Sequence, residues 1–110
     1  QALTLLNSKL SFELAESLAA LLIEEFGNDR RAWIKAAYAR TLGRPATVDE
    51  LDSVETFLKA NESKLRANKR IRDSLAIPQD LPKDVDPFAA AALTDFCLVL
   101  FNLNEFIYID

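Results

Sequence analysis

The chain has 110 residues, half of them apolar, and a net charge of −4 at neutral pH. This length corresponds to one domain with one core, so we expect a single helical domain over residues 1–110. Two glycines and four prolines are too few for the turns of a many-stranded β protein, and helix-forming residues dominate. The acidic balance argues against a dedicated nucleic-acid-binding protein. The absence of histidine removes the commonest general base and metal ligand.

Positive charge is concentrated in the middle of the chain. Residues 30–72 carry 11 basic and 5 acidic side chains. Residues 1–29 carry 1 basic and 5 acidic side chains, and residues 73–110 carry 1 basic and 7 acidic side chains. We therefore expect the middle segment to form ion pairs with the two ends. No apolar stretch reaches the ~18 residues of a membrane span, and no signal peptide is recognisable. The chain opens with the helix-like QALTLL and no methionine, so we expect a fragment of a longer protein.

The first helical pattern lies near the N-terminus. Residues 2–6 are expected to end a preceding helix. Ser8 or Ser11 then caps a helix predicted over residues 12–26, which ends at Gly27. Apolar residues recur every three or four positions along it and predict one buried stripe. They are Leu14, Leu18, Leu21, Leu22 and Phe26.

A second helix is predicted over residues 30–42, with Asn28 or Asp29 as its N-cap. Gly43 is expected to end it with a positive φ angle, because only glycine adopts that backbone without cost. Pro45 prevents its continuation. The predicted buried residues are Trp33, Ile34, Ala37, Tyr38 and Leu42.

A third helix is predicted to open with a capping box made by Thr47 and Glu50. In this motif the threonine hydroxyl accepts the backbone N–H of the glutamate, whose carboxylate accepts the backbone N–H of the threonine. We expect the helix to reach about residue 74. The basic run at residues 64–72 would then suit the negative end of its dipole. The predicted buried residues are Leu51, Val54, Leu58 and Leu65.

Three of the four prolines fall within residues 76–87, which predicts a loop. Asp86 is expected to cap a fourth helix over residues 88–104, with Pro87 in its first turn. A helix that is apolar nearly all round is expected to be buried nearly all round. The residues predicted to be nearly inaccessible are Leu93, Phe96, Cys97 and Leu100.

Together these patterns predict an all-α fold, a compact bundle of about four helices with a buried C-terminal helix. The closing NEFIYID fits either a continued helix or an extended segment. Because only three other helices are available to cover the fourth, part of its surface is expected to face a missing part of the parent protein. No feature of the sequence indicates an oligomeric state.

No catalytic or metal-binding motif is present. With two glycines and one cysteine, the chain holds no phosphate-binding glycine loop and no cysteine pair for zinc or covalent haem. Cys97 lies in an apolar run and is expected to be a buried structural thiol. Asp80, Asp84 and Asp86 lack the glycine and terminal glutamate of a calcium-binding loop. We therefore predict no catalytic residue, metal site or cofactor within this chain.

Two charged features leave alternatives open. Carboxylates that share helix faces could act as acid and base in glycoside hydrolysis, but solvated faces give the same pattern and we favour that interpretation. They are Glu13, Glu16, Asp49, Glu50, Asp52 and Glu55. The run at residues 64–72 could bind phosphate or an anionic glycan, or pair with the acidic loop that follows. It holds no aromatic residue to stack on bases, so we expect no nucleic-acid binding. Asp95 is expected to pair with an arginine.

Three stretches carry a family resemblance: QALTLLN at residues 1–7, TLGRPATVDEL at 41–51 and LTDFCLVLFNLNEFIYID at 93–110. In this order they resemble the C-terminal end of a planctomycete-type domain of unknown function, whose corresponding patterns are LLN, LGRPPTxxEL and LLNxNEFxYxD. The closing segment is the most specific of the three. Ala46 stands where a second proline is usual, and Phe101 where leucine is usual.

The resemblance implies a large exported bacterial protein, periplasmic or at the cell surface. Such proteins often carry a cytochrome c-like haem domain and another uncharacterised domain upstream, and polysaccharide breakdown is suggested for them. Haem, if present, is therefore expected in the upstream domains. No catalytic residues of the family are established that could be carried over to this sequence.

Two functions follow as expectations. The first is a non-catalytic C-terminal module that packs against, or binds, the upstream domains of its own chain. The second is a module that completes an active site of a polysaccharide-degrading or redox enzyme built upstream. In that case the binding contributors are Arg44, Asn104 and Glu105, at the two signature turns. The alternative is a purely structural role for these residues, in which Arg44 pairs with Glu105 and Asn104 satisfies the backbone groups at a helix end.

Overall fold

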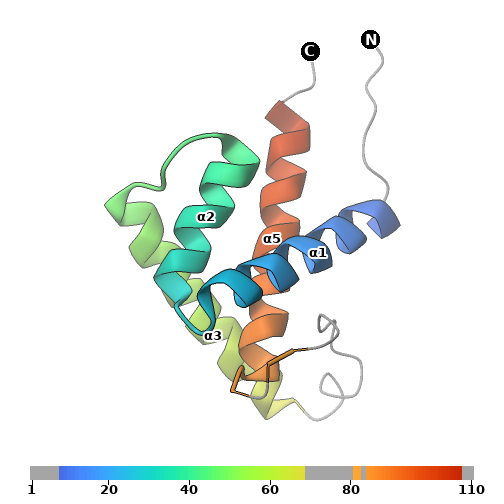
Figure 1. Cartoon of the computed structure of the whole chain (residues 1–110), viewed down its shortest axis with the longest axis vertical. Coiled ribbons are helices and arrows are strands. Elements are labelled where there is room, and N and C mark those ends of the chain that lie inside the picture. Colours follow the sequence, from blue (N-terminus) through green and yellow to red (C-terminus); the bar gives the residue numbers. More distant parts are fainter. Residues whose placement is uncertain (1–7, 69–80, 83, 108–110) are drawn as a thin grey trace.

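The computed structural model describes residues 8–68, 81–82 and 84–107, with Ser8 and residues 104–107 described by their backbone alone. This part of the chain contains four helices and no strand, so the predicted all-α bundle is confirmed (Figure 1). The helices are α1 (Ser8–Phe26), α2 (Arg30–Leu42), α3 (Val48–Ala67) and α5 (Pro87–Ile107). The expected helix end at residues 2–6 lies outside the described residues.

Helix α5 is the central element of the bundle. It packs against each of the other three helices and most extensively against α1, which crosses it (Figure 1). The four residues predicted to be nearly inaccessible are confirmed as buried: Leu93, Phe96, Cys97 and Leu100. Small alanines at positions 89–92 allow the other helices to approach the N-terminal half of α5 closely, and all four are buried.

The C-terminal half of α5 departs from the prediction that the helix is buried nearly all round. Val99 and Leu103 each leave 49% of their surface exposed. In Figure 1 the end of α5 extends past α1 and away from α3, so fewer neighbours cover it there. Helix α5 also continues to Ile107, so residues 104–107 of the closing segment are helical.

Helix α1 begins four residues earlier than predicted, at Ser8. Ser11 is therefore not a cap. It lies inside the helix, is buried, and its Oγ has no hydrogen-bond partner. The buried face of α1 is also rotated from the predicted stripe, because Leu21 is 52% exposed and Phe26 is exposed. The face that enters the core follows the same three- and four-residue spacing through Ala15, Leu18, Ala19, Leu22 and Ile23.

Helix α2 has the predicted bounds and the predicted ends. Asp29 is its N-cap and accepts the backbone N–H of Ala32 at 3.1 Å. Gly43 ends it with φ 70°, and its backbone N–H donates to the carbonyl of Ala39 at 3.1 Å. The buried indole of Trp33 donates from Nε1 to the carbonyl of Gly27 at 2.9 Å, which fixes the α1–α2 turn against the core.

The capping box at the start of α3 is confirmed. The backbone N–H of Glu50 donates to Thr47 Oγ1 at 3.1 Å, and the backbone N–H of Thr47 donates to Glu50 Oε1 at 2.9 Å. The predicted length is wrong, since α3 ends at Ala67 and not near residue 74. Asn68 is the C-cap in an extended conformation, consistent with the low helix propensity of asparagine.

The start of α5 is also as predicted. Pro87 is its first residue, where the missing backbone N–H has no helical role. Asp86 Oδ1 accepts the backbone N–H of Phe88 at 2.9 Å, and the backbone carbonyl of Asp86 accepts that of Ala90. No helix in the described part of the chain is both long enough and apolar enough to cross a membrane.

Candidate functional site

Arg44 stands at the turn between α2 and α3, where its guanidinium is held from several sides. Nη1 and Nη2 donate to Oε1 and Oε2 of Glu50, both at 2.8 Å, and Nη1 also donates to the carbonyl of Pro45 at 3.1 Å. The guanidinium lies 5.3 Å from the centre of the Tyr38 ring, a cation–π geometry. Thus Glu50 serves twice, as capping residue and as the bidentate partner of Arg44.

This arrangement perturbs both partners. Hydrogen bonds from Arg44, and then from the backbone of Thr47, lower the pKa of Glu50 from 4.5 to about 2. The hydrogen bond to Glu50 raises the pKa of Arg44. Both side chains are solvated, so the pair fixes the geometry of the turn more than it stabilises the fold.

Of the three residues expected to contribute to a shared site, only Arg44 has a described side chain. Its partner is Glu50, a pairing that the sequence interpretation did not anticipate. Asn104 and Glu105 lie in the last turns of α5, and their side chains fall outside the described residues. The predicted pair between Arg44 and Glu105 therefore stays a prediction.

A shallow groove of about 400 Å³ lies beside the same turn, open to solvent and lined mostly by apolar atoms. We call it the α2 groove. Three of its residues, Lys35, Ala39 and Gly43, follow one another at four-residue spacing and so share a face of α2 and its C-cap. Its lining is Lys35, Ala39, Gly43, Arg44, Pro45 and Ala46.

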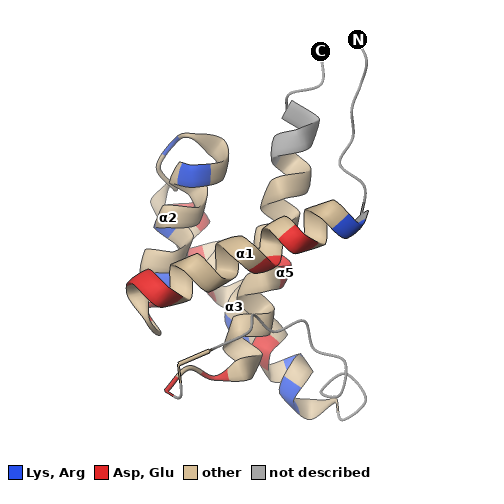
Figure 2. Cartoon of the chain, turned by 45° about the vertical axis from the view of Figure 1, so that its right-hand side comes forward, with Lys and Arg blue, Asp and Glu red and all other residues tan. Residues whose placement is uncertain are grey.

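Helix α5 presents a second distinctive surface near its C-terminal end. Val99 and Leu103 are half exposed and lie one helical turn apart, flanked by the partly buried Leu98 and Phe101. We call these four residues the α5 surface. No charged residue occurs between positions 96 and 103, and Figure 2 shows this part of the helix without a red or blue segment.

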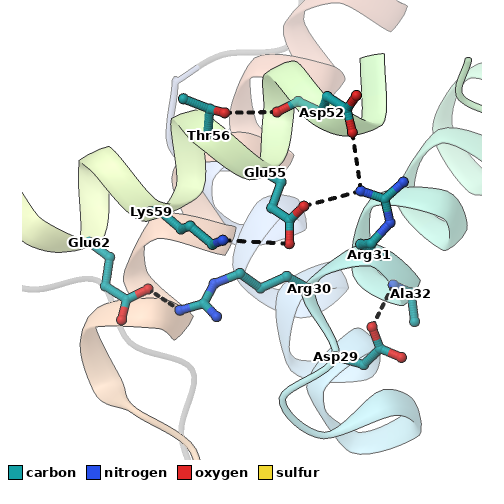
Figure 3. A network of polar contacts seen from close by, with 9 residues as sticks. All are labelled: Asp29, Arg30, Arg31, Ala32, Asp52, Glu55, Thr56, Lys59 and Glu62. Atoms are coloured by element: carbon teal, nitrogen blue, oxygen red, sulfur yellow. Dashed lines mark hydrogen bonds and ion pairs between the residues drawn. The ribbon is translucent and has the colours of Figure 1, made fainter. Parts of the chain in front are cut away.

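Three of the six carboxylates weighed as catalytic pairs, Glu50, Asp52 and Glu55, are bound to arginines between α2 and α3. Arg31 Nη1 contacts Asp52 at 3.3 Å and Glu55 at 3.1 Å, and Lys59 lies 3.9 Å from Glu55 (Figure 3). Deeper in the same interface, Arg30 contacts the buried Glu62 at 2.5 Å. These contacts align the two helices, which supports the solvated-face interpretation.

The remaining carboxylates of that set are Glu13, Glu16 and Asp49. Glu13 and Asp49 are exposed and Glu16 is half-buried. The expectation that the middle of the chain pairs with its ends is right for two contacts, Arg40 with Glu25 and Arg66 with Asp86. The other ion pairs between described residues lie within the middle segment itself.

The described part of the basic run pairs with the acidic loop, one of the two alternatives raised for it. Arg66 contacts Asp86, and it contacts Glu62 at 3.3 Å. Its guanidinium also lies 5.0 Å from the centre of the Phe88 ring. Burial raises the pKa of Asp86, but hydrogen bonds from the Phe88 backbone and from Arg66 outweigh it, so the net shift is downward.

Helix α5 carries two further side chains with potential reactivity, Asp95 and Cys97. Asp95 accepts a hydrogen bond from Asn61 Nδ2 at 2.9 Å. No arginine among the described residues forms an ion pair with it, and Arg70 and Arg72 lie outside those residues, so the arginine partner stays a prediction. Burial raises the pKa of the Cys97 thiol to about 12, consistent with the predicted structural role. The described residues contain no group of three or more side chains arranged to hold a metal ion.

Comparison with known proteins adds no assignment. No protein-family model, curated protein or solved structure matches this chain. The resemblance to the planctomycete-type domain therefore stays a prediction that rests on the three sequence segments.

Proposed function

We propose that this chain is a non-catalytic helical module that binds a protein surface supplied by upstream domains of the same exported bacterial protein. The observation that carries the proposal is the α5 surface. Val99 and Leu103 belong to the most buried helix of the bundle, yet each leaves half of its surface in contact with water. Apolar side chains gathered on one uncharged face are typical of a surface that another protein covers.

The neighbouring helix adds to this argument. Leu10 and Phe12, in the first turns of α1, are exposed apolar residues. Helix α1 is the one that packs most extensively against α5. Covering these side chains would remove apolar area from water at about 25 cal/mol per Å². The proposal assigns that covering to the parent protein, for which the resemblance implies a periplasmic or cell-surface location.

The non-catalytic part of the proposal rests on the state of the reactive groups. The Cys97 thiol has a pKa of about 12 and is buried, so it is a poor nucleophile at neutral pH. Asp95 is bound by an amide, Asn61, and not by a second carboxylate. The alternative of a shared active site needs Arg44 to reach a substrate, although both of its Nη atoms already bind Glu50.

The binding test mixes this chain with the remainder of its parent protein, produced as a separate polypeptide, in an isothermal titration. We expect a one-to-one complex. Val99→Glu and Leu103→Glu should each weaken it at least tenfold, because each places a charge in an apolar interface. Val48→Glu is the matched control, since Val48 is an exposed valine on the first turn of α3.

Circular dichroism of each variant separates loss of binding from loss of fold. Absence of a complex between the wild-type pieces, or equal weakening by Val48→Glu, would refute binding through the α5 surface.

A separate assay tests the absence of catalysis. The wild-type chain and Asp95→Asn are incubated with a panel of glycan and ester substrates. We expect no turnover by either protein. Turnover by the wild type that disappears in Asp95→Asn would overturn the non-catalytic assignment, whatever the result of the binding test.

A further inference from the structure

The α2 groove is a concave surface separate from the α5 surface. Its volume of about 400 Å³ is within the range of sites that take a few side chains or a small ligand. Because it is open, a small free molecule would stay largely hydrated there, whereas small-ligand sites bury most of their ligand. Its shape therefore favours a segment of a larger molecule, with contacts that continue outside the groove.

The groove exists because several of the residues that line it have small side chains or none. Ala39 and Gly43 occupy successive turns on one face of α2 and its C-cap, and Pro45 and Ala46 line the same groove from the segment that follows the helix. The positive φ of Gly43 ends the helix, so the chain leaves the helix axis before Pro45 and Ala46. A Cβ atom at Gly43 would meet nothing within 4 Å, which shows that the space above it is open.

The net positive charge of the groove comes from Lys35, at one end of it. Arg44 is neutralised by its bidentate pair with Glu50. Lys35 is exposed and forms no ion pair within the described part of the chain. Lys35 also lies about 12 Å from Gly43 along the helix, at a rise of about 1.5 Å per residue. Its ammonium is therefore well separated from the carbonyl groups at the C-terminal end of α2, where a negative ligand group is disfavoured.

We infer that the α2 groove binds an extended peptide in which an apolar side chain and a carboxylate lie two residues apart. Side chains two positions apart point to the same side of an extended strand, about 6.6 Å from one another. The apolar side chain would lie over Ala39, Pro45 and Ala46, and the carboxylate would meet the Lys35 ammonium. This site is independent of the α5 surface, so either can fail without the other.

The test is a titration of the ¹⁵N-labelled chain, followed by heteronuclear NMR, with the capped pentapeptide acetyl-Ala-Leu-Ala-Glu-Ala-amide. We expect saturable shifts confined to the amides of Lys35, Ala39, Gly43 and Ala46. Replacing Glu in the peptide by Gln, or Leu by Ala, should weaken binding. Lys35→Gln should weaken it by up to about fivefold, the upper end for an exposed ion pair. Ala39→Leu fills the floor with a good helix former and should abolish it.

Lys9→Gln is the matched control, because Lys9 is another exposed lysine, on α1. It should leave the affinity unchanged. Equal shifts with the Gln peptide, equal weakening by Lys9→Gln, or shifts unrelated to the groove would overturn the inference. So would binding of free 4-methylpentanoate as tight as that of the peptide, since the groove would then be a small-molecule site.

Discussion

Two identical substitutions, one at the N-cap of α3 and one inside the helix, are expected to change the free energy of unfolding in opposite directions. Thr47 and Thr56 are both exposed threonines, and each hydroxyl forms one hydrogen bond with the backbone. Thr47 is the N-cap, and its hydroxyl accepts the N–H of Glu50 at 3.1 Å. Thr56 is in the helix interior, and its hydroxyl donates to the carbonyl of Asp52 at 2.9 Å.

Thr47→Ala removes the acceptor of an N–H that has no partner within the helix. The typical cost is about 1 kcal/mol. Thr56→Ala removes a bond to a carbonyl that the helix already satisfies, and alanine is the better helix former by about 0.5 kcal/mol. We therefore expect Thr47→Ala to destabilise the fold by about 1 kcal/mol and Thr56→Ala to stabilise it by up to about 0.5 kcal/mol.

Urea unfolding followed by circular dichroism at 222 nm measures both changes. With a urea dependence of about 1–3 kcal/mol/M, Thr47→Ala should lower the unfolding midpoint by about 0.3–1 M, and Thr56→Ala should raise it slightly. Thr47→Ser keeps the hydroxyl and should behave almost as the wild type. The reasoning is refuted if the two alanine variants shift the midpoint in the same direction, or if Thr47→Ser is as unstable as Thr47→Ala.

Three further predictions concern the ion pair and the core. The pKa of Glu50 is lowered to about 2, so its charge stabilises the fold above its ordinary pKa of 4.5, and this contribution is lost as the pH falls from 4.5 towards 2. The urea midpoint of the wild type should accordingly exceed that of Glu50→Gln at pH 6 and converge with it near pH 2, whereas a gap independent of pH would contradict the pairing with Arg44. Cys97 should react with a thiol reagent only as fast as the chain opens, because it is fully buried and its pKa is raised to about 12. Rapid labelling of the folded chain would show that α5 is not the core helix. Leu93→Ala should lower the free energy of unfolding by about 2–5 kcal/mol in the same urea assay, since Leu93 is fully buried and the substitution leaves a cavity, and a loss below about 1 kcal/mol would mean that the site is poorly packed.

Local sequence patterns are sufficient to predict the helices and most of their ends. The cap at Asp29, the stop at Gly43, the capping box at Thr47 and the cap at Asp86 each join groups at most four residues apart. Such contacts depend on local backbone geometry and residue chemistry, so they can be recognised without the fold. The all-α class follows from the same local preferences summed over the chain.

Which helix faces are buried and which charged residues pair depends on how the helices pack. The three- and four-residue spacing of α1 was recognised, but several apolar stripes fit it, and packing against α5 selected the one through Ala15 and Ala19 and left Leu21 in water. Asp95 binds Asn61, 34 residues away, and the α2 groove depends on the turn that brings Pro45 and Ala46 back beside α2. The four-residue spacing of Lys35, Ala39 and Gly43 was a readable signal of that groove's floor. The contact of Asp95 with Asn61 carried no such signal, because long-range pairing depends on how whole helices pack, and no local pattern encodes that choice.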